Sequence, residues 1–363
     1  PLRPETPLIN GRSGEDERLA KIATMFGKET TLVEAAPAGD IVAVAKLSDT
    51  ATGDTLAPKN KPVRAMPIDR PEPVLATAVV ARTQADDDKL STSLARVLDE
   101  DASLKVTHDA ETRQTLLWGM GETHIQITIE KLARKFGVDV DQEAVRVAYR
   151  ETISRRADAE GKHKKQSGGH GQFGVCHLVL APLARGEGFV FHDAVKGGSI
   201  PRQFIPAVEK GIIETMDEGG LHGYPVVDIE ATVDDGKYHS VDSSEMAFKL
   251  AARAGFRAAF EAGGPVVLEP VSKVEVTVPP EYQGDVMGDI AARRGAVQGS
   301  MANVDGTQTI SAEVPTSEIV RYAIDLRSLT NGWGRFSAHL DHYQELPSHM
   351  VDRALAAAAA DQS

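Results

Sequence analysis

Residues 164–174 read KKQSGGHGQFG and combine two lysines with the spacing Gly169-x-Gly171-x-x-Gly174. Glycines before a helix hold a pyrophosphate on main-chain amides, whereas glycines in a basic loop allow close approach to a nucleic-acid backbone. The following VCHLVLAPLARGEGFVF is apolar but broken by proline and glycine, which predicts strand, turn and strand. A dinucleotide fingerprint requires a helix there, so the sequence argues against that fold, although Asp193 lies about twenty residues on. The alternative that this is a hairpin loop, rich in glycine only because its turn requires it, stays open.

The local charge favours nucleic acid more than the total charge does. The chain has a net charge of -13, which by itself argues against binding phosphates. From Arg155 to Gly174, however, five basic residues stand against two acidic ones, a net of +3 before histidines are counted. In this interpretation the lysines supply charge, the glutamines contact base or sugar edges and the rings stack on a base. The residues concerned are Lys164, Lys165, Gln166, Gln172, His170 and Phe173. The alternative to stacking, given equal weight, is that Phe173 only fills the base of the hairpin.

Catalytic and metal-binding patterns are weak. Ser243 and Ser244 precede an expected helix and are interpreted as caps, because no G-x-S-x-G elbow surrounds them. Four aspartates are interpreted as solvated turn acids: Asp228, Asp234, Asp235 and Asp242. The spacing of the histidines and the single cysteine matches no zinc motif; they are His163, His170, Cys176, His177, His339 and His342. We therefore predict no catalytic residue and no metal.

No nucleotide-hydrolysing motif is present in the sequence. The phosphate loop G-x-x-x-x-G-K-[ST] is absent, and Asn60-Lys61 is followed by Pro-Val rather than by the aspartate of a guanine-reading loop. We expect the chain alone not to hydrolyse a nucleotide.

Length and composition indicate several globular domains in a reducing compartment. The 363 residues predict two to four domains, and 41% hydrophobic content is ordinary for such proteins. A single cysteine excludes an internal disulfide. No apolar run reaches membrane-spanning length, and PLRPETPLING has neither a signal-like core nor an initiating methionine. We expect a soluble, cytoplasmic chain cut from a longer protein.

The apolar patterns predict an α+β protein of several domains. The first residues have the texture of part of a small β-barrel, with strands at Thr31–Val33 and Ile41–Val44 and a turn at Thr52–Leu56, and Ala57–Pro73 is a proline-rich linker. A β-α-β-β-α-β order, the ferredoxin-like plan, follows. Its elements are Val74–Val80, Asp86–Asp101, a hairpin in Val106–Gly119, Glu122–Phe136 and Val138–Tyr149.

The same order returns near the C-terminus, which predicts a second ferredoxin-like domain. Its elements are Lys273–Val278, Tyr282–Arg294, Ala296–Val304, Gln308–Val314, Thr316–Leu329 and Gly334–Tyr343, with a helical tail at Met350–Ala360. Between the two repeats, we expect a helix at Ile205–Glu218, a strand at Val226–Val233 and a turn at Asp234–Gly236. His239 then lies in an ordered loop before a helix that starts at Ser243–Glu245, and the two polar loops of this middle domain could form one tip.

Five long blocks resemble bacterial translation elongation factor G in the family's own order. They are KQSGGHGQFG, GGSIPRQFIPAVEKGI, GYPVVDIEATVDDGKYHSVDSSEMAFKLAA, EYQGDVMGDIAARRGAVQG and DLRSLTNGWGRFSAHLDHYQELP. GMGETHIQITIEKLARKFGVDV and VRVAYRETI resemble its third domain, and AGDIVAVAKLSDTATGDTL its second. The resemblance implies part of the domain II barrel with a linker at 1–72, domain III at 73–149, a domain IV like ribosomal protein S5 at 150–270, domain V at 271–345 and a tail at 346–363.

The resemblance also implies a function on the ribosome. In the family, GTP hydrolysis accompanies movement of tRNA and mRNA by one codon, and the tip of domain IV enters the decoding region. That tip corresponds to Lys164, Lys165, Gln166, Ser167, Gly168, Gly169, His170, Gly171, Gln172, Phe173 and His239. Domain V faces the stalk base and the sarcin-ricin region, with Arg293 and Arg294 as phosphate contacts. GTP and Mg²⁺ are expected in a missing N-terminal domain, no cofactor is expected in this chain, and the factor is expected to be a monomer away from membranes.

Departures from the family pattern suggest a divergent paralogue. His170 stands where arginine or lysine is usual, Thr123 replaces the leucine of GMGELH, and Trp333 replaces a polar or basic residue. A paralogue of this kind acts in ribosome recycling, or occupies the factor site without translocation. A non-hydrolysing ribosome-binding protein is the second hypothesis, and an independent metal- or nucleotide-dependent enzyme the third. The state of the phosphate loop and guanine-reading loop upstream of Pro1 would separate the first two.

Overall fold

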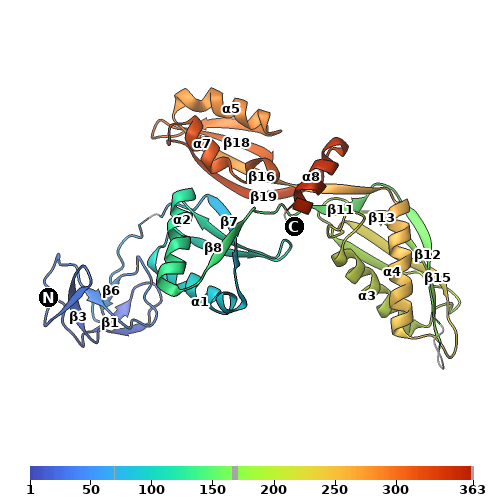
Figure 1. The fold of residues 1–363 in the computed structure, drawn as a ribbon, viewed down its shortest axis with the longest axis horizontal. Helices are drawn as coiled ribbons and strands as arrows, with labels where there is room; N and C mark the ends of the chain where they lie inside the picture. Colours follow the sequence, from blue (N-terminus) through green and yellow to red (C-terminus); the bar gives the residue numbers. More distant parts are fainter. Residues whose placement is uncertain (69, 166–170, 361–363) are drawn as a thin grey trace. The chain divides into compact units, whose positions relative to one another are not determined.

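The structure of the chain, a computed structural model, describes residues 1–68, 70–165 and 171–360. Internal contacts divide the chain into two compact units. One unit comprises Pro1–Pro73, Ala81–Val106 and Leu117–Asp141, and the other comprises Val74–Val80, Thr107–Leu116 and Gln142–Ser363. The elements combine several small sheets with helices, which confirms the predicted α+β multidomain class (Figure 1).

The first sixty residues form two three-stranded sheets. One has the order β2-β1-β6, from Asp16–Arg18, Pro7–Asn10 and Leu56–Pro58. The other has the order β4-β3-β5, from Glu29–Val33, Ile22–Phe26 and Ala43–Val44. Leu8, Leu19 and Ile22 supply their core. The described residues of this region form no closed barrel, and the strand expected at 41–44 is shorter, with Ile41 90% exposed.

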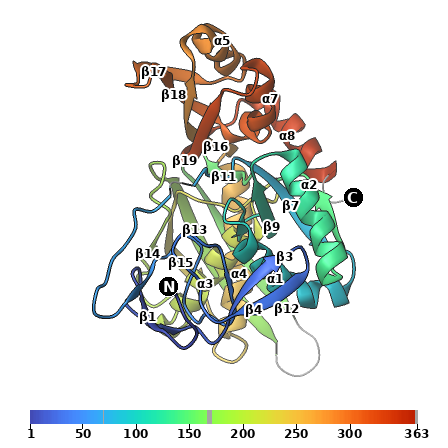
Figure 2. The ribbon, with the colours of Figure 1, turned by 90° about the vertical axis from the view of Figure 1, so that its left-hand side faces the viewer.

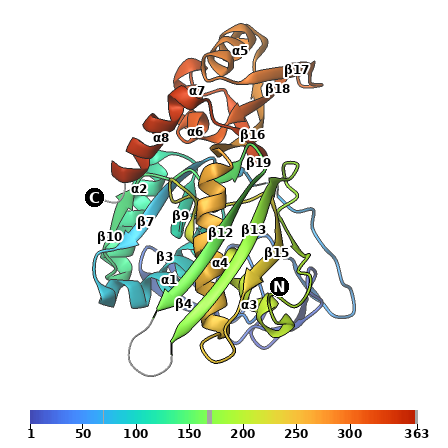
Figure 3. The ribbon, with the colours of Figure 1, turned by 90° about the vertical axis from the view of Figure 1, so that its right-hand side faces the viewer.

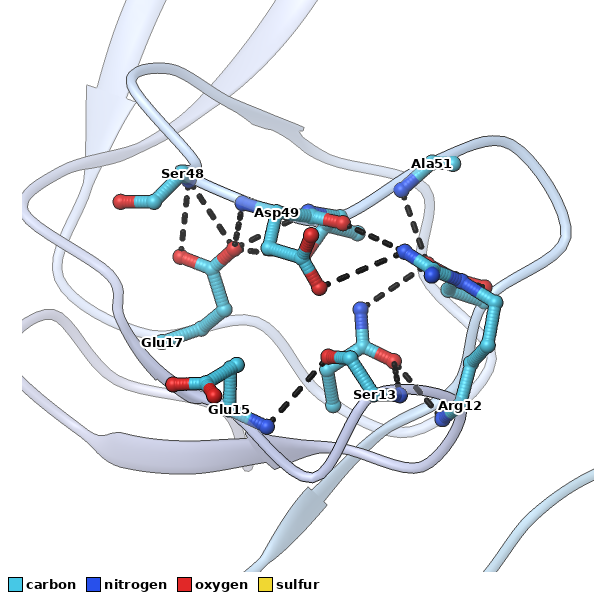
Figure 4. A network of polar contacts seen from close by, with 10 residues as sticks. Arg12, Ser13, Glu15, Glu17, Ser48, Asp49 and Ala51 are labelled. Atoms are coloured by element: carbon cyan, nitrogen blue, oxygen red, sulfur yellow. Dashed lines mark hydrogen bonds and ion pairs between the residues drawn. The ribbon is translucent and has the colours of Figure 1, made fainter.

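A buried carboxylate organises the loop before β6 (Figure 4). Glu17, on β2, is only 3% exposed, and its side chain accepts hydrogen bonds from the main-chain amides of Ser48, Asp49 and Thr50 at 2.7 to 3.1 Å. These donors favour the charged form and lower the pKa of Glu17. Arg12 holds the same loop through an ion pair with Asp49. The loop that leads into the turn predicted at Thr52–Leu56 is thus fixed by Glu17 on β2 and by Arg12 in the turn between β1 and β2.

The next elements follow the predicted β-α-β-β-α-β order. They are β7 (Leu75–Ala81), α1 (Gln84–Glu100), β8 (Lys105–Asp109), β9 (Gln114–Gly119), α2 (Glu122–Lys131) and β10 (Val140–Glu143). The sheet order β10-β7-β9-β8 is that of a ferredoxin-like domain. The second helix ends in a π-helical turn, η1 (Leu132–Phe136), which Gly137 closes at φ +63°. The closing strand is shorter than expected.

The middle domain is a four-stranded sheet with two helices on one face (Figure 3). The sheet order is β12-β13-β15-β14, from Ala157–Lys165, Gln172–Pro182, Ile229–Lys237 and Phe189–Asp193. The helices are α3 (Ile205–Glu218), preceded by the 3-10 turn η2 (Arg202–Phe204), and α4 (Glu245–Ala262). Leu178 and Leu180 of β13 pack with Val208, Ile212 and Phe248 of the helices in one core.

The turn predicted at Asp234–Gly236 is wrong, because all three residues belong to β15. Asp235 and Gly236 pair with His177 and Cys176 of β13, and a register shift between His177 and Leu178 leaves Asp234 as the extra residue of a bulge. A side chain on Gly236 would place its Cβ 2.4 Å from the carbonyl oxygen of Val175. The glycine therefore serves close strand contact rather than a turn.

The second predicted ferredoxin-like repeat is also present. Its elements are β16 (Pro265–Val278), η3 (Pro280–Tyr282), α5 (Gln283–Ala292), β17 (Ala296–Ala302), β18 (Gln308–Pro315), α6 (Thr316–Ile319), α7 (Tyr322–Leu329) and β19 (Arg335–Glu345). The order β19-β16-β18-β17 matches the plan, and β11 (Arg150–Ile153) adds to the start of β16. α5 and α7 lie on one face of this sheet (Figure 2). The helix expected at 316–329 is interrupted at Arg321, and the predicted tail helix is α8 (Ser348–Ala360).

Candidate nucleic-acid interface

The described ends of the basic glycine-rich segment, residues 164–165 and 171–174, lie where β12 and β13 reach the same end of the middle sheet (Figure 3). Lys164 and Lys165 end β12 and are exposed, and Gln172 begins β13 opposite Lys165. The side-chain oxygen of Gln172 lies 2.9 Å from Nε2 of His163. Five predicted contact residues lie outside the described residues: Gln166, Ser167, Gly168, Gly169 and His170.

The structure brings the glycine segment and the His239 loop together, as the sequence suggested. The amide of Gly171 donates to Oδ1 of Asp242 at 3.1 Å, and the amide of Phe173 donates to the main-chain oxygen of Asp242 at 2.9 Å. The hydroxyl of Ser243 donates to the carbonyl of Phe173 at 2.8 Å. We call residues 171–173 and 238–243 the tip.

His239 forms the other half of the tip. Its amide donates to Oγ of Ser243 at 2.8 Å, and its Nδ1 faces the amides of Val241 and Asp242 at 3.4 and 3.3 Å. A neutral ring that accepts at Nδ1 carries its proton on Nε2, which leaves one donor free for a ligand. The side chain is 55% exposed, and the ring lies edge-on to that of Phe173, with centroids 6.4 Å apart. The tip therefore presents an aromatic pair beside lysines.

Two of the three glycines in the motif serve packing within the protein. A Cβ on Gly171 would lie 3.0 Å from the carboxyl carbon of Asp242, and one on Gly174 would lie 3.0 Å from the main chain of Ala247 in α4. Neither glycine adopts positive φ. The spacing that resembled a phosphate-binding motif thus reflects the close approach of β13 to the His239 loop and the first turn of α4.

The sequence interpretation missed exposed apolar side chains at this end of the domain. Tyr238 and Val241 on the tip are 50% and 62% exposed, and Met246 in the first turn of α4 is 53% exposed. A flat ring beside basic residues, as at Tyr238, suits stacking on bases without sequence selection. Their signal was present in KYHSVDSSEM, where an aromatic and a β-branched residue interrupt a polar loop.

The aspartates and serines of this region are more constrained than the sequence suggested. Asp228 is not a solvated turn acid, because it is 3% exposed and accepts from two glycine amides at 3.0 Å. Asp242 is not one either, since it bridges the two loops. Ser244 caps α4 through the amide of Ala247, as predicted, whereas Ser243 ties the loops together.

Cys176 and His177 serve the sheet rather than a metal. Burial raises the pKa of the Cys176 thiol to about 12. His177 lies between Asp234 at 2.7 Å and Asp158 at 3.1 Å, and hydrogen bonding to Asp234 is the main cause of its raised pKa. Among the described residues, no group of three or more histidine, cysteine or acidic side chains could hold a metal ion.

Arg293 and Arg294 are held by carboxylates. Arg293 pairs with Asp289 and Asp325, both at 2.9 Å. Arg294 donates two hydrogen bonds of 2.8 Å to Glu269, whose side chain is 1% exposed. A phosphate at either guanidinium would have to compete with these partners, and phosphate contact there remains a prediction.

Comparisons with known proteins point to one family along most of the chain. Matches were found to elongation factor G domain 2 at residues 1–59, domain III at 70–144, domain IV at 145–264 and the elongation factor G C-terminus at 266–354. A crystal structure of a protein from Thermus thermophilus superposes with a TM-score of 0.79 and 36% sequence identity. The superposition covers 99% of this chain but only 54% of that chain. Within the described residues, no helix is both long and apolar enough to cross a membrane.

Proposed function

Since the chain belongs to the elongation factor G family, we propose that it is the ribosome-binding part of a factor that drives GTP-dependent movement of tRNA and mRNA. The proposal has the tip of the domain IV region enter the decoding region of the small subunit. The chain spans about half of the similar solved protein, so the activity belongs to a longer polypeptide in this proposal. GTP and Mg²⁺ are assigned to a further domain of that polypeptide, because this sequence has no phosphate loop.

The observation that supports the proposal is the joined tip. Two loops about seventy residues apart in sequence are tied by hydrogen bonds and present an exposed histidine, a half-buried phenylalanine and neighbouring lysines at one end of the sheet. Such a surface suits a nucleic-acid backbone and unstacked bases, which proteins recognise largely by shape, charge and stacking.

The tip need not break any bond to act. It would occupy space beside the codon-anticodon duplex and interact differently with the ribosome before and after movement, which biases the equilibrium between the two states. Nucleotide hydrolysis elsewhere in the factor would supply the free energy. Domain V would contact large-subunit RNA, and tRNA, mRNA and the ribosome are the proposed partners.

Toeprinting of pre-translocation ribosomes with the full-length factor and GTP tests the proposal. The native factor should shift the toeprint by one codon, and His239→Ala should slow the shift more than it weakens ribosome binding. His192→Ala is the matched control: this histidine is equally exposed, at 54%, but lies on β14 near the other end of the sheet. Ribosome binding without a shift would reject translocation in favour of a paralogue that recycles ribosomes or occupies the factor site. Equal losses of binding and movement in His239→Ala would reject the role of the tip.

A further inference from the structure

We propose that Asp242 is the positioning residue of the tip, an inference that rests on the proposed function. Asp242 contacts the glycine segment and His239 at the same time. Its Oδ1 accepts from the amide of Gly171 at 3.1 Å, its main-chain oxygen accepts from the amide of Phe173 at 2.9 Å, and its own amide donates to Nδ1 of His239 at 3.3 Å. The side chain therefore joins the glycine segment to the histidine loop.

The core, rather than solvent, sets the position of Asp242. The next residue, Ser243, donates to Phe173 and accepts from His239, and Ser244 caps the 18-residue helix α4. α4 packs on the sheet through fully buried side chains that include Phe248. A residue fixed at the start of such a helix has little freedom, so it can hold a loop that lacks a core of its own.

The geometry also explains why a short acid stands at this position. Oδ1 accepts from the Gly171 amide, which alanine cannot do and asparagine can, since its side-chain oxygen is also an acceptor. The space is tight, since a Cβ on Gly171 would meet the carboxylate of Asp242 at 3.0 Å. A methyl group there would push the carboxylate away from the Gly171 amide. Gly171→Ala should therefore resemble Asp242→Ala.

Loss of the hydrogen bond between Asp242 and Gly171 should lower the rate of tRNA and mRNA movement rather than the affinity for the ribosome. With the two loops uncoupled, Phe173 and His239 hold their edge-on arrangement only part of the time, and the effective rate falls with that fraction. In the proposed function, domain V also contacts the ribosome and is unchanged in these variants, so affinity should be largely retained.

The first experiment measures amide exchange by NMR on this chain and needs no ribosome. In Asp242→Ala, the Gly171 amide should exchange about tenfold faster, because it loses a hydrogen bond of ordinary strength. Asp242→Asn should change it less than about threefold, since an acceptor remains. Val190→Ala, an exposed change on β14 of the same domain but outside the tip, is the control and should leave the rate unaltered. An unchanged Gly171 amide in Asp242→Ala, with the fold intact by circular dichroism, overturns the inference.

The second experiment compares the same variants by toeprinting in the full-length factor. Asp242→Ala should slow the shift about tenfold at saturating factor with an unchanged half-saturating concentration, and Asp242→Asn should restore most of the rate. Faster exchange without a slower shift overturns the positioning role. If the native factor produces no shift, the proposed function fails, while the exchange data still decide whether Asp242 couples the loops.

Discussion

Replacing Arg294 by alanine should destabilise the C-terminal ferredoxin-like sheet by about 3–5 kcal/mol. The guanidinium makes two hydrogen bonds of 2.8 Å to Glu269, a side chain that is 1% exposed on β16. Within the described residues, Gln344 also donates to that carboxylate, at 3.1 Å, but it is uncharged. Alanine would leave the buried Glu269 carboxylate without its cation, and an uncompensated buried charge is the main cost of breaking a buried ion pair. Arg294 has φ +62°, but alanine bears the same backbone strain, which cancels in the comparison.

A double-mutant cycle isolates this cost. Glu269→Gln removes the buried charge while keeping a hydrogen-bond acceptor, and Arg294 is 28% exposed, so water can reach its guanidinium. In that background, Arg294→Ala should cost only about 1–2 kcal/mol, the value of hydrogen bonds to an uncharged group. The coupling free energy between the two positions is then about 2–3 kcal/mol. Arg294→Lys keeps the charge but loses the bidentate geometry and should fall between the two.

Hydrogen exchange with mass spectrometry suits the measurement, because a chain of several domains does not unfold in one step. The free energy of local opening is read from the peptides of β16 and β18, with those of α4 as an internal reference. A loss of protection below about tenfold in Arg294→Ala, equal to about 1.4 kcal/mol, would refute the reasoning. So would an equal cost in the Glu269→Gln background. Full stability with weakened ribosome binding would instead give Arg294 the RNA contact predicted from the sequence.

Three further predictions concern packing at glycines, the buried cysteine and the histidine held between two aspartates. Gly161→Ala should cost about 3 kcal/mol in a thermal melt, because its Cβ would lie 2.0 Å from the carbonyl oxygen of Ala251 in α4, whereas Gly288→Ala, with open space around it, should stabilise its helix by up to about 1 kcal/mol. Cys176 should resist alkylation at pH 8 until the chain unfolds, because its pKa is raised to about 12; fast labelling of the native chain would contradict its burial. Hydrogen bonding to Asp234 raises the pKa of His177 in the folded state, so the protonated ring stabilises the fold. This stabilisation is complete below about pH 6.5 and is lost progressively as pH rises through the folded-state pKa. The midpoint of the melting transition that includes the middle domain should therefore fall in the native chain relative to His177→Asn between about pH 6 and 8.5, and parallel curves would refute the claim.

The sequence predicted those elements whose signals are local. The apolar stripe from Ile205 to Met216 located α3 to the residue, and the serines before Glu245 located the start of α4. The turn at Asp234–Gly236 failed because turn propensity is a local signal, whereas β13 pairs along its length with that segment. Likewise, both loops of the tip could be recognised, but the contact between Gly171 and Asp242 joins residues 71 positions apart and has no local signal.

An acidic chain can still carry an RNA-binding tip, because its charges are separated along β12. Asp158 and Glu160 lie toward one end of the strand, with Asp234 beside them around His177, whereas Lys164 and Lys165 lie at the other. Asp158 and Lys164 are six residues apart, which is about 20 Å along a strand and more than two Debye lengths at physiological ionic strength. The acidic end therefore cannot cancel the field at the tip. It disfavours phosphates around His177 and leaves the lysines at the tip end of β12 available. In the proposed function, the net charge of -13 therefore does not by itself oppose binding at the tip.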